Sequence, residues 1–408
     1  MVENPTVEGL AKDRNRTKAM IAITVSAFTS GLAVGAVMPL ISMSMELRGE
    51  SADNIGYVVA AAPLALMMTG PFINPMVRVF GLLGSMVLGT MLVVATMIAL
   101  PFWYGIPEWI VLRFVAGIGI AAVWILSETW VNALATNQNR GRLISLFMFV
   151  MTLGFGLGPV LVSIIGPSEI RTFFIAAAII AASLIPLVMA RNVAPDLGIP
   201  QKWSFIQAFR VAPLVMATAL LAGVTDSAQI SFIPVYGVRM GQGESTALYM
   251  LIAIISGTVL SQVPLYFFSD RVDRNKLLVI CLVACFALGG VVPFVLDQPI
   301  LLWPVLVLWG GTAFALYSIA IILLGDRFAP AELAGANAAF VCVFEMGSII
   351  GPISVGHAME QMGPNGMPAV LVVSCLPLLV LALWRRVLRP RITRHRAAEK
   401  QKSRKAEK

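Results

Sequence analysis

The stretch GFGLGP, residues 154–159, interrupts a long apolar segment with three glycines and a proline. The stretch GSIIGP, residues 347–352, has the same frame of Gly, three residues, Gly and Pro, 193 residues later. Glycine and proline weaken a helix in water, but between membrane helices small residues let two backbones approach closely. We therefore predict a smooth, kinked surface that slides between two similar halves of the chain, with a static packing seam as the alternative. The predicted interface residues are Gly154, Gly158, Pro159, Gly347, Gly351 and Pro352.

The composition is that of a membrane protein. Hydrophobic residues make up 58% of the 408 residues and charged residues only 12%, about half the share in a soluble domain. A helix needs roughly 20 apolar residues to cross a bilayer core. Twelve segments meet this requirement, so we predict an all-α integral membrane fold. The predicted spans are 19–42, 55–76, 84–103, 109–134, 143–166, 171–190, 209–236, 247–268, 277–296, 300–324, 335–359 and 367–388.

Lysine and arginine are distributed unevenly between the predicted loops. With the N-terminus in the cytoplasm, 25 of the 29 Lys and Arg residues fall on the cytoplasmic side, and only Arg48, Arg113, Arg171 and Arg239 remain elsewhere. This positive-inside bias predicts a multi-pass protein with both termini in the cytoplasm. The basic tail could bind nucleic acid, but we expect it to lie near anionic lipid instead, so nucleic acid is not a predicted partner. We see no cleavage site of a signal peptide and expect the first span to be retained.

The offset of 193 residues relates more than the two glycine motifs. It places Pro71 with Pro264 at the ends of the second and eighth spans, and Arg78 with Arg271 in the loops that follow. Internal repeats in transporters place the substrate site between the halves, and rocking of the halves exposes it to each side in turn. The predicted divisions are an N-terminal six-helix bundle (1–190), a cytoplasmic connector (191–208), a C-terminal six-helix bundle (209–388) and a basic cytoplasmic tail (389–408).

The loop FSDRVDRNK, residues 268–276, carries the first resemblance to a known family. Together with two sets of six spans and a central connector, it resembles the major facilitator superfamily, whose signature loop runs roughly G-x-x-x-D-R-x-G-R-[RK]. Tyr266 and Asp273 stand where that pattern has its two glycines, and the first-half copy at 70–84 keeps Arg78 as its one clear charge. The matching residues are Asp270, Arg271, Arg274 and Lys276.

A closer likeness is to the YcaD-like bacterial members of that superfamily. It rests on RFVAGIGIAAVWILSETW (113–130), NRGRLISLFM (139–148) and GANAAFVCVFEMGSIIGP (335–352) and extends over nearly the whole chain. The resemblance implies a transporter of the bacterial inner membrane. GFGLGP is also similar to the fifth-span motif of proton-driven drug exporters, although VLVSIIG follows Pro159 in place of that motif's paired glycines.

A few ionisable residues lie within the predicted spans, where each costs roughly 2.5–3.5 kcal/mol and commonly faces a cavity or partner. Asp226 lies halfway along the seventh span, with Gln229 one turn away on the same face. We predict that it binds protons or substrate, since desolvation makes a carboxylate easier to protonate; the alternative is a hydrogen bond that serves packing. For Glu345, a coupling role and a structural hydrogen bond both stay open. Arg113 resembles the arginine of the family's fourth-span R-x-x-x-G pattern, which implies a role near the cavity or in proton transfer.

The family resemblance also implies two gating groups on the cytoplasmic side. In the family, an acid at the inner end of the fourth span often pairs with basic loop residues, so we expect Glu128 to form a gating ion pair rather than to couple protons directly. Asp270, Arg271 and Arg274 are expected to form a latch after the eighth span that breaks as the halves rock; the alternative is that they only set orientation. The basic residues available to Glu128 are Arg78, Arg140 and Arg142.

Three further polar or aromatic residues have predicted positions. Trp124 and Tyr317 are expected in the cavity, because the fourth and tenth spans line it in the family. Asn337 is expected to hydrogen-bond across helices.

These features predict a proton-coupled secondary active transporter that moves a small molecule by alternating access. No Walker frame is present, so ATP does not drive it directly. The alternatives are a proton antiporter that exports lipophilic cations, because acids outnumber Arg113 within the spans, and a non-transporting sensor or scaffold. We expect a monomer with no enzymatic activity, no cofactor and no metal. The four cysteines, Cys281, Cys285, Cys342 and Cys375, are expected to be apolar packing residues.

Overall fold

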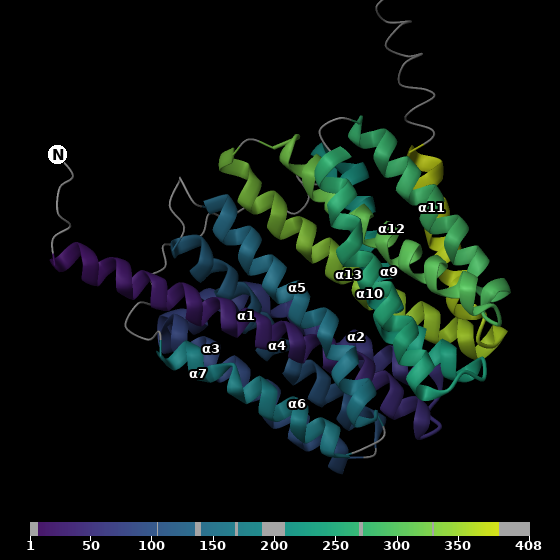
Figure 1. The fold of residues 1–408 in the computed structure, drawn as a ribbon, viewed down its shortest axis with the longest axis horizontal. Helices are drawn as coiled ribbons and strands as arrows, with labels where there is room; N and C mark the ends of the chain where they lie inside the picture. Colours follow the sequence, from purple (N-terminus) through teal and green to yellow (C-terminus); the bar gives the residue numbers. More distant parts are fainter. Residues whose placement is uncertain are drawn as a thin grey trace, which may run out of the picture.

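The computed structural model describes residues 7–103, 105–134, 140–167, 170–189, 209–268, 272–328 and 330–382 (Figure 1). The predicted connector 191–208 and tail 389–408 lie outside these ranges. The helices of the first half are α1 (Val7–Leu47), α2 (Ala52–Thr69), α3 (Ile73–Ala99), α4 (Ile106–Leu134), α5 (Arg140–Ile165), α6 (Ile170–Ala182) and α7 (Leu184–Met189). The helices of the second half are α9 (Pro213–Arg239), α10 (Glu244–Phe268), α11 (Arg274–Val295), α12 (Pro299–Gly325), α13 (Pro330–Met362) and a last apolar helix, Gly366–Ala382.

The helices agree with the predicted spans, with shifted ends. Within the described ranges, 10 segments are long and apolar enough to cross a membrane; one of them, Ala52–Phe102, contains both α2 and α3, and Gly366–Ala382 is shorter. Each of the twelve predicted spans overlaps one of these segments or the last helix. The predicted second span is too long: α2 ends at Thr69, because Gly70 and Pro71 start a 3-10 turn that leads into α3.

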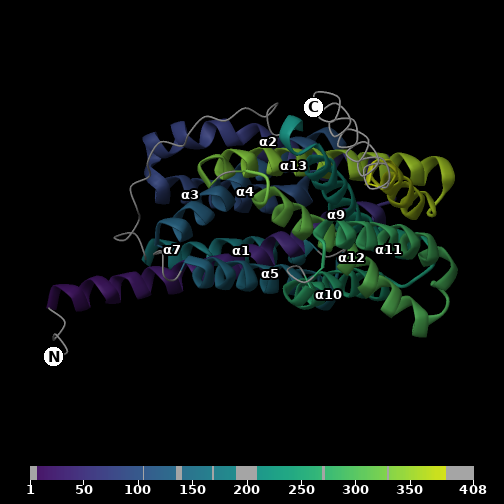
Figure 2. The same cartoon turned by 90° about the horizontal axis from the view of Figure 1, so that it is seen from above.

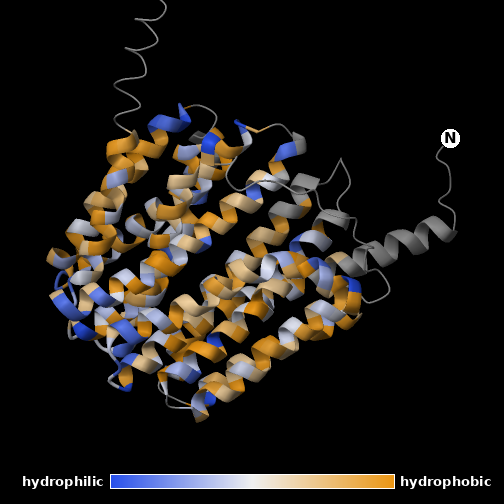
Figure 3. Cartoon of the chain, turned by 180° about the vertical axis from the view of Figure 1, so that it is seen from behind, coloured by the Kyte–Doolittle hydropathy of each residue, from blue (hydrophilic) through white to orange (hydrophobic). Residues whose placement is uncertain are grey.

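The outer surface of the bundle is apolar, as contact with lipid requires. Large hydrophobic side chains such as Ile300, Phe294 and Val79 are more than two-thirds exposed. Hydrophobic residues dominate the middles of the helices, whereas many hydrophilic ones lie at helix ends (Figure 3). A bilayer provides no hydrogen-bond partners, so a helical backbone with apolar side chains is the arrangement that this environment favours.

The two halves are separate bundles that lie against each other. The helices α1–α7 gather on one side and α9–α13 on the other (Figure 1). In the first half α1 packs along α5, and in the second α9 packs along α13 (Figures 1 and 2). These are equivalent pairs under the repeat, so each half is built on the same central contact.

The glycine motifs form these central contacts within the halves. A Cβ atom at Gly154 would collide with the Phe28 carbonyl of α1, and one at Gly347 would collide with the Leu220 carbonyl of α9. Gly158 and Gly351 approach the same two helices. The prediction that these four glycines form a sliding interface between the halves is therefore wrong. Their small size brings two helices of one bundle together, which is the static seam given as the alternative.

The contact between the halves uses other small residues. The helix α2 lies against α13, α5 against α10, and α1 against α9. A Cβ at Gly56 would meet the carbonyl of Pro352 at 2.6 Å, so Pro352 does border the other half, while Gly356 approaches Ala52. On the second contact, Gly156, the middle glycine of GFGLGP, faces Ile255.

The seams give a testable prediction about stability. Gly154→Ala and Gly347→Ala should each lower the melting temperature of the purified protein by several degrees, because overpacking of a tight contact costs about 1–3 kcal/mol. Gly290 of α11 is a matched control, since a Cβ there would meet no described residue beyond its own stretch of helix within 4 Å. Thermal unfolding of Gly290→Ala should match the parent or exceed it. Equal melting temperatures for all three variants would contradict the close seam.

Candidate functional site

The helix α9 places Asp226 in the interior of the bundle. The helix α9 is the most deeply buried of the candidate membrane spans. Asp226 itself is partly buried, and Gln229, one turn further on, is 2% exposed. The amide nitrogen of Gln229 has no hydrogen-bond partner in the described part of the chain. An unpaired donor one turn from a carboxylate leaves polar groups that a bound solute could satisfy.

A second group of predicted residues converges on Tyr317 of α12. Its hydroxyl lies within electrostatic range of the carboxylates of Glu128, Asp226 and Glu345. Asp226 and Glu345 also lie within range of each other. These four residues come from α4, α9, α12 and α13, so acids from both halves act electrostatically on the same hydroxyl.

Aromatic rings surround Tyr317 on the side of the second half. The Tyr317 ring lies 5.4 Å from that of Phe340 and 5.1 Å from that of Phe344, both in edge-to-face geometry, and 5.9 Å from the stacked ring of Phe314. This packing fixes the ring of Tyr317 and therefore the position of its hydroxyl.

Glu128 of α4 is held by a hydrogen bond from a neighbouring side chain on its own helix. The indole N–H of Trp124 donates a hydrogen bond of 3.0 Å to Glu128 Oε1. Trp124 is 42% exposed and is one turn away on α4. The backbone of α5 includes Arg140 and Arg142, but their side chains lie outside the description, so the predicted ion pair with them stays a prediction. Arg78 is exposed, and within the described ranges it has no ion-pair partner.

Arg113 of α4 is buried, at 1% exposure. Its Nε and Nη1 atoms have no hydrogen-bond partner among the described residues. Burying a guanidinium whose Nε and Nη1 lack hydrogen bonds is costly. Its predicted role near the cavity or in proton transfer stays a prediction.

Two other predictions meet different outcomes. Asn337 is exposed near the start of α13 and makes no hydrogen bond with any described residue, so the predicted interhelical bond is wrong.

Arg274 pairs with Asp326, which directly follows α12 in the same half. Asp270 and Arg271 lie outside the described residues, so a latch between the halves at this loop stays a prediction. Asp273 replaces the expected glycine because its carboxylate caps α11, accepting from the Lys276 N–H at 2.9 Å.

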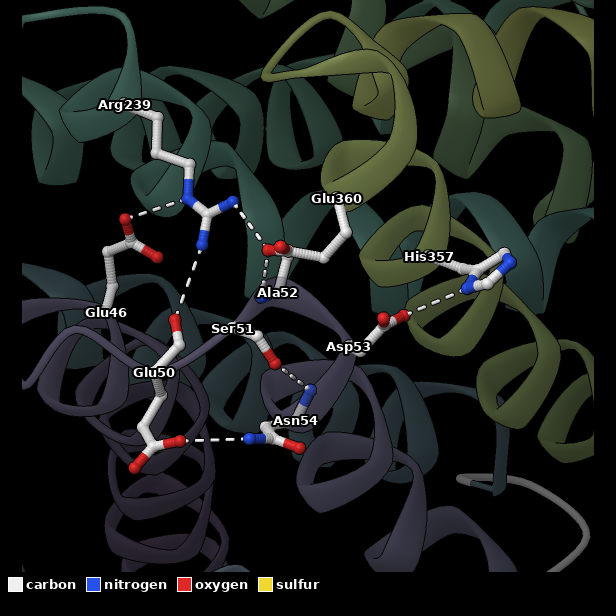
Figure 4. A network of polar contacts seen from close by, with 9 residues as sticks. All are labelled: Glu46, Glu50, Ser51, Ala52, Asp53, Asn54, Arg239, His357 and Glu360. Carbon is white, nitrogen blue, oxygen red and sulfur yellow. Dashed lines mark hydrogen bonds and ion pairs between the residues drawn. The ribbon is translucent and has the colours of Figure 1, made fainter.

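A polar network that the sequence did not predict joins the halves at the C-terminal end of α1 (Figure 4). Arg239, the last residue of α9, donates to Glu46 Oε1 at 2.8 Å and to Glu360 Oε1 at 3.0 Å. A third donor of its guanidinium reaches the Glu50 carbonyl at 3.4 Å. Glu360 Oε1 also accepts from the Ala52 N–H, at the first turn of α2, at 2.7 Å.

A histidine contact lies beside this network. His357 Nδ1 is 3.2 Å from Asp53 Oδ1, and Gln361 is 2.7 Å from the other ring nitrogen (Figure 4 shows the His357–Asp53 pair). The side chain of His357 is 61% exposed. Two signals could have identified these residues: Arg239 is one of four basic residues outside the predicted cytoplasmic segments, and Glu46 precedes it by 193 residues, the offset of the repeat.

The model of the Major Facilitator Superfamily matches residues 23–341 and 257–408. The chain belongs to this superfamily. It is 26% identical over 350 residues to the uncharacterised MFS-type transporter YfkF of Bacillus subtilis, covering 84% of this chain and 88% of that protein. It is 24% identical over 355 residues to the uncharacterised MFS-type transporter YcaD of Salmonella arizonae, covering 86% and 91%. The predicted superfamily and the likeness to YcaD are thus confirmed.

Solved transporters share the fold of this chain. The nucleoside transporter NupG superposes with a TM-score of 0.72 at 16% identity, over 90% of this chain and 97% of that one. A D-xylose–proton symporter gives 0.67 at 17%, over 90% and 96%. This Major Facilitator Superfamily chain is therefore a multi-pass membrane transporter by family and fold, and it is not an enzyme.

Proposed function

We propose that the chain is a proton-coupled secondary active transporter that moves a small solute across the bacterial inner membrane by alternating access, with both termini in the cytoplasm. The observation that carries this proposal is that Asp226, Glu345 and Glu128, from both halves, all lie within electrostatic range of the Tyr317 hydroxyl. The orientation rests on the excess of Lys and Arg in the predicted cytoplasmic segments. With this orientation, the network around Arg239 lies on the outer side.

The proximity of the carboxylates supports proton coupling. Asp226 and Glu345 repel each other when both are ionised, and a proton on either one relieves the repulsion. A solute that approaches the pair changes this balance, so binding of solute and of protons become linked. Glu128 belongs to the first half, whereas Asp226 and Glu345 belong to the second. Rocking of the halves therefore changes the distance of Glu128 from the other two carboxylates.

A second candidate is proton-driven export of lipophilic cations. It is favoured by the aromatic rings beside the acids: Tyr317, Phe340 and Phe344 in the second half and Trp124 in the first. A nearby carboxylate and the face of an aromatic ring both attract a cation electrostatically. The nucleoside transporter and the D-xylose–proton symporter share only the fold at their low identity, so nucleosides and sugars serve as comparison probes.

Proton release on solute binding tests the function without knowledge of direction. Adding a lipophilic cationic dye to the purified protein in weak buffer should release protons in proportion to bound dye if the second candidate holds, because dye and proton compete for the acids. Nucleosides and pentoses are the matched neutral probes, for which binding with proton uptake would indicate symport. Binding of a probe with no proton exchange at any pH would contradict coupling. No binding by any class of probe would favour a sensor or scaffold.

A further inference from the structure

We propose that Arg239 is the gating residue of the transport cycle at the end of the bundle formed by the C-terminal ends of α1 and α9. Four contacts cross between the halves there: Arg239 with Glu46 and with the Glu50 carbonyl, Glu360 with the Ala52 N–H, and His357 with Asp53 (Figure 4). Arg239 makes two of the four and also holds Glu360, through which a third is made. It is therefore the hub of this closure.

The repeat explains why a charge pair forms at this place. Arg239 and Glu46 are 193 residues apart and end equivalent helices of the two halves. Equivalent positions of two related halves lie close together near the axis that relates them. An exact repeat would place the same charged residue at both positions, and the two like charges would repel each other. Glu46 and Arg239 carry opposite charges instead, and these attract.

Burial identifies the dominant contact. The side chains of Arg239 and Glu46 are 21% and 10% exposed, whereas those of His357 and Asp53 are 61% and 30% exposed. Exposed ion pairs contribute little because water and salt screen them. The pair at Arg239 is more protected, so we assign the closure to it and not to the histidine.

Glu46 makes the closure sensitive to loss of Arg239. Its Oε2 atom is buried and has no hydrogen-bond partner among the described residues, so the arginine supplies the counter-charge on which this carboxylate depends. Without Arg239, the closed state retains a carboxylate that is neither paired nor well hydrated. Opening this end admits water to Glu46, so removal of Arg239 shifts the population toward the state open at this end.

Glu360 adds a directional element. Its Oε1 accepts from Arg239 and from the Ala52 N–H, where the N-terminal end of α2 attracts a negative charge. Arg239 thus orients an acid of its own half toward a helix start of the other half. Arg239→Lys keeps the charge but loses the forked geometry that joins both acids. We therefore expect its population of the state open at this end to lie between those of the parent and of Arg239→Gln.

Spin labels on the two halves test this inference, which rests on the alternating access proposed above but needs neither solute nor protons. With the native cysteines replaced, Tyr57→Cys on α2 and Ser245→Cys on α10 provide exposed sites near the network. Arg239→Gln should raise the ratio of long to short inter-label distances about tenfold. Asn54→Ala removes a hydrogen bond to Glu50 within the first half and should leave the ratio unchanged.

A double-mutant cycle separates a gate from a structural role. Glu46→Gln with Arg239→Gln removes the orphaned carboxylate, so its distance ratio should return toward the parent instead of equalling the product of the two single effects. Parental distances in Arg239→Gln, or independent effects of the two changes, would overturn the assignment. Because the readout is a distance, either outcome is distinguishable from failure of proton coupling at Asp226.

Discussion

Replacing Asp226 by asparagine should reduce proton-driven accumulation of the solute to the level of empty liposomes. The amide has nearly the same shape but does not bind and release a proton, so it leaves the solute site assembled and removes its link to the proton gradient. Exchange of labelled for unlabelled solute, which needs no net proton movement, should persist. The measurement is uptake into proteoliposomes with an imposed pH gradient, compared with exchange at equal pH.

Two variants define how specific that loss is. Glu345→Gln removes the second acid, which interacts electrostatically with Asp226. We expect it to weaken proton coupling less than Asp226→Asn does. Glu332→Gln changes an exposed acid in the first turn of α13 and should leave accumulation unaltered. Full accumulation by Asp226→Asn would remove this residue from the coupling mechanism, and equal loss in Glu332→Gln would show a general effect of charge.

Hydropathy and the internal repeat predict most of the fold. Span positions follow from runs of apolar residues, because a helix must satisfy its own backbone in lipid. The 193-residue offset pairs GFGLGP with GSIIGP correctly, and both lie in the central seam of their own half. The same pattern does not predict which helix packs against each glycine. Gly154 meets α1 and Gly347 meets α9, whereas Gly56 and Gly156 face the other half, and only the packed structure distinguishes these surfaces.

The candidate site was predictable in part. Asp226 and Glu345 are identifiable because ionisable groups are rare at membrane depth, and Tyr317 because the tenth span lines the cavity in the family; in the structure both carboxylates act electrostatically on the Tyr317 hydroxyl. The family resemblance implies a cytoplasmic gating role for Glu128, which stays a prediction, whereas its hydrogen bond with Trp124 on the same helix is visible only in the structure. Arg239, Glu46 and Glu360 were missed because charges at helix ends are ordinary. Their importance comes from three-dimensional contacts between residues 121 and 193 positions apart.

Locking the end of the bundle around Arg239 tests the central claim most directly. Asp53 and His357 face each other across the halves at 3.2 Å, so Asp53→Cys with His357→Cys, in a background without the four native cysteines, can be joined by a short cleavable thiol cross-linker. Alternating access predicts that complete cross-linking stops solute flux and that reductive cleavage restores it, while either single-cysteine variant keeps its flux throughout. Undiminished flux through the fully cross-linked protein would contradict the account.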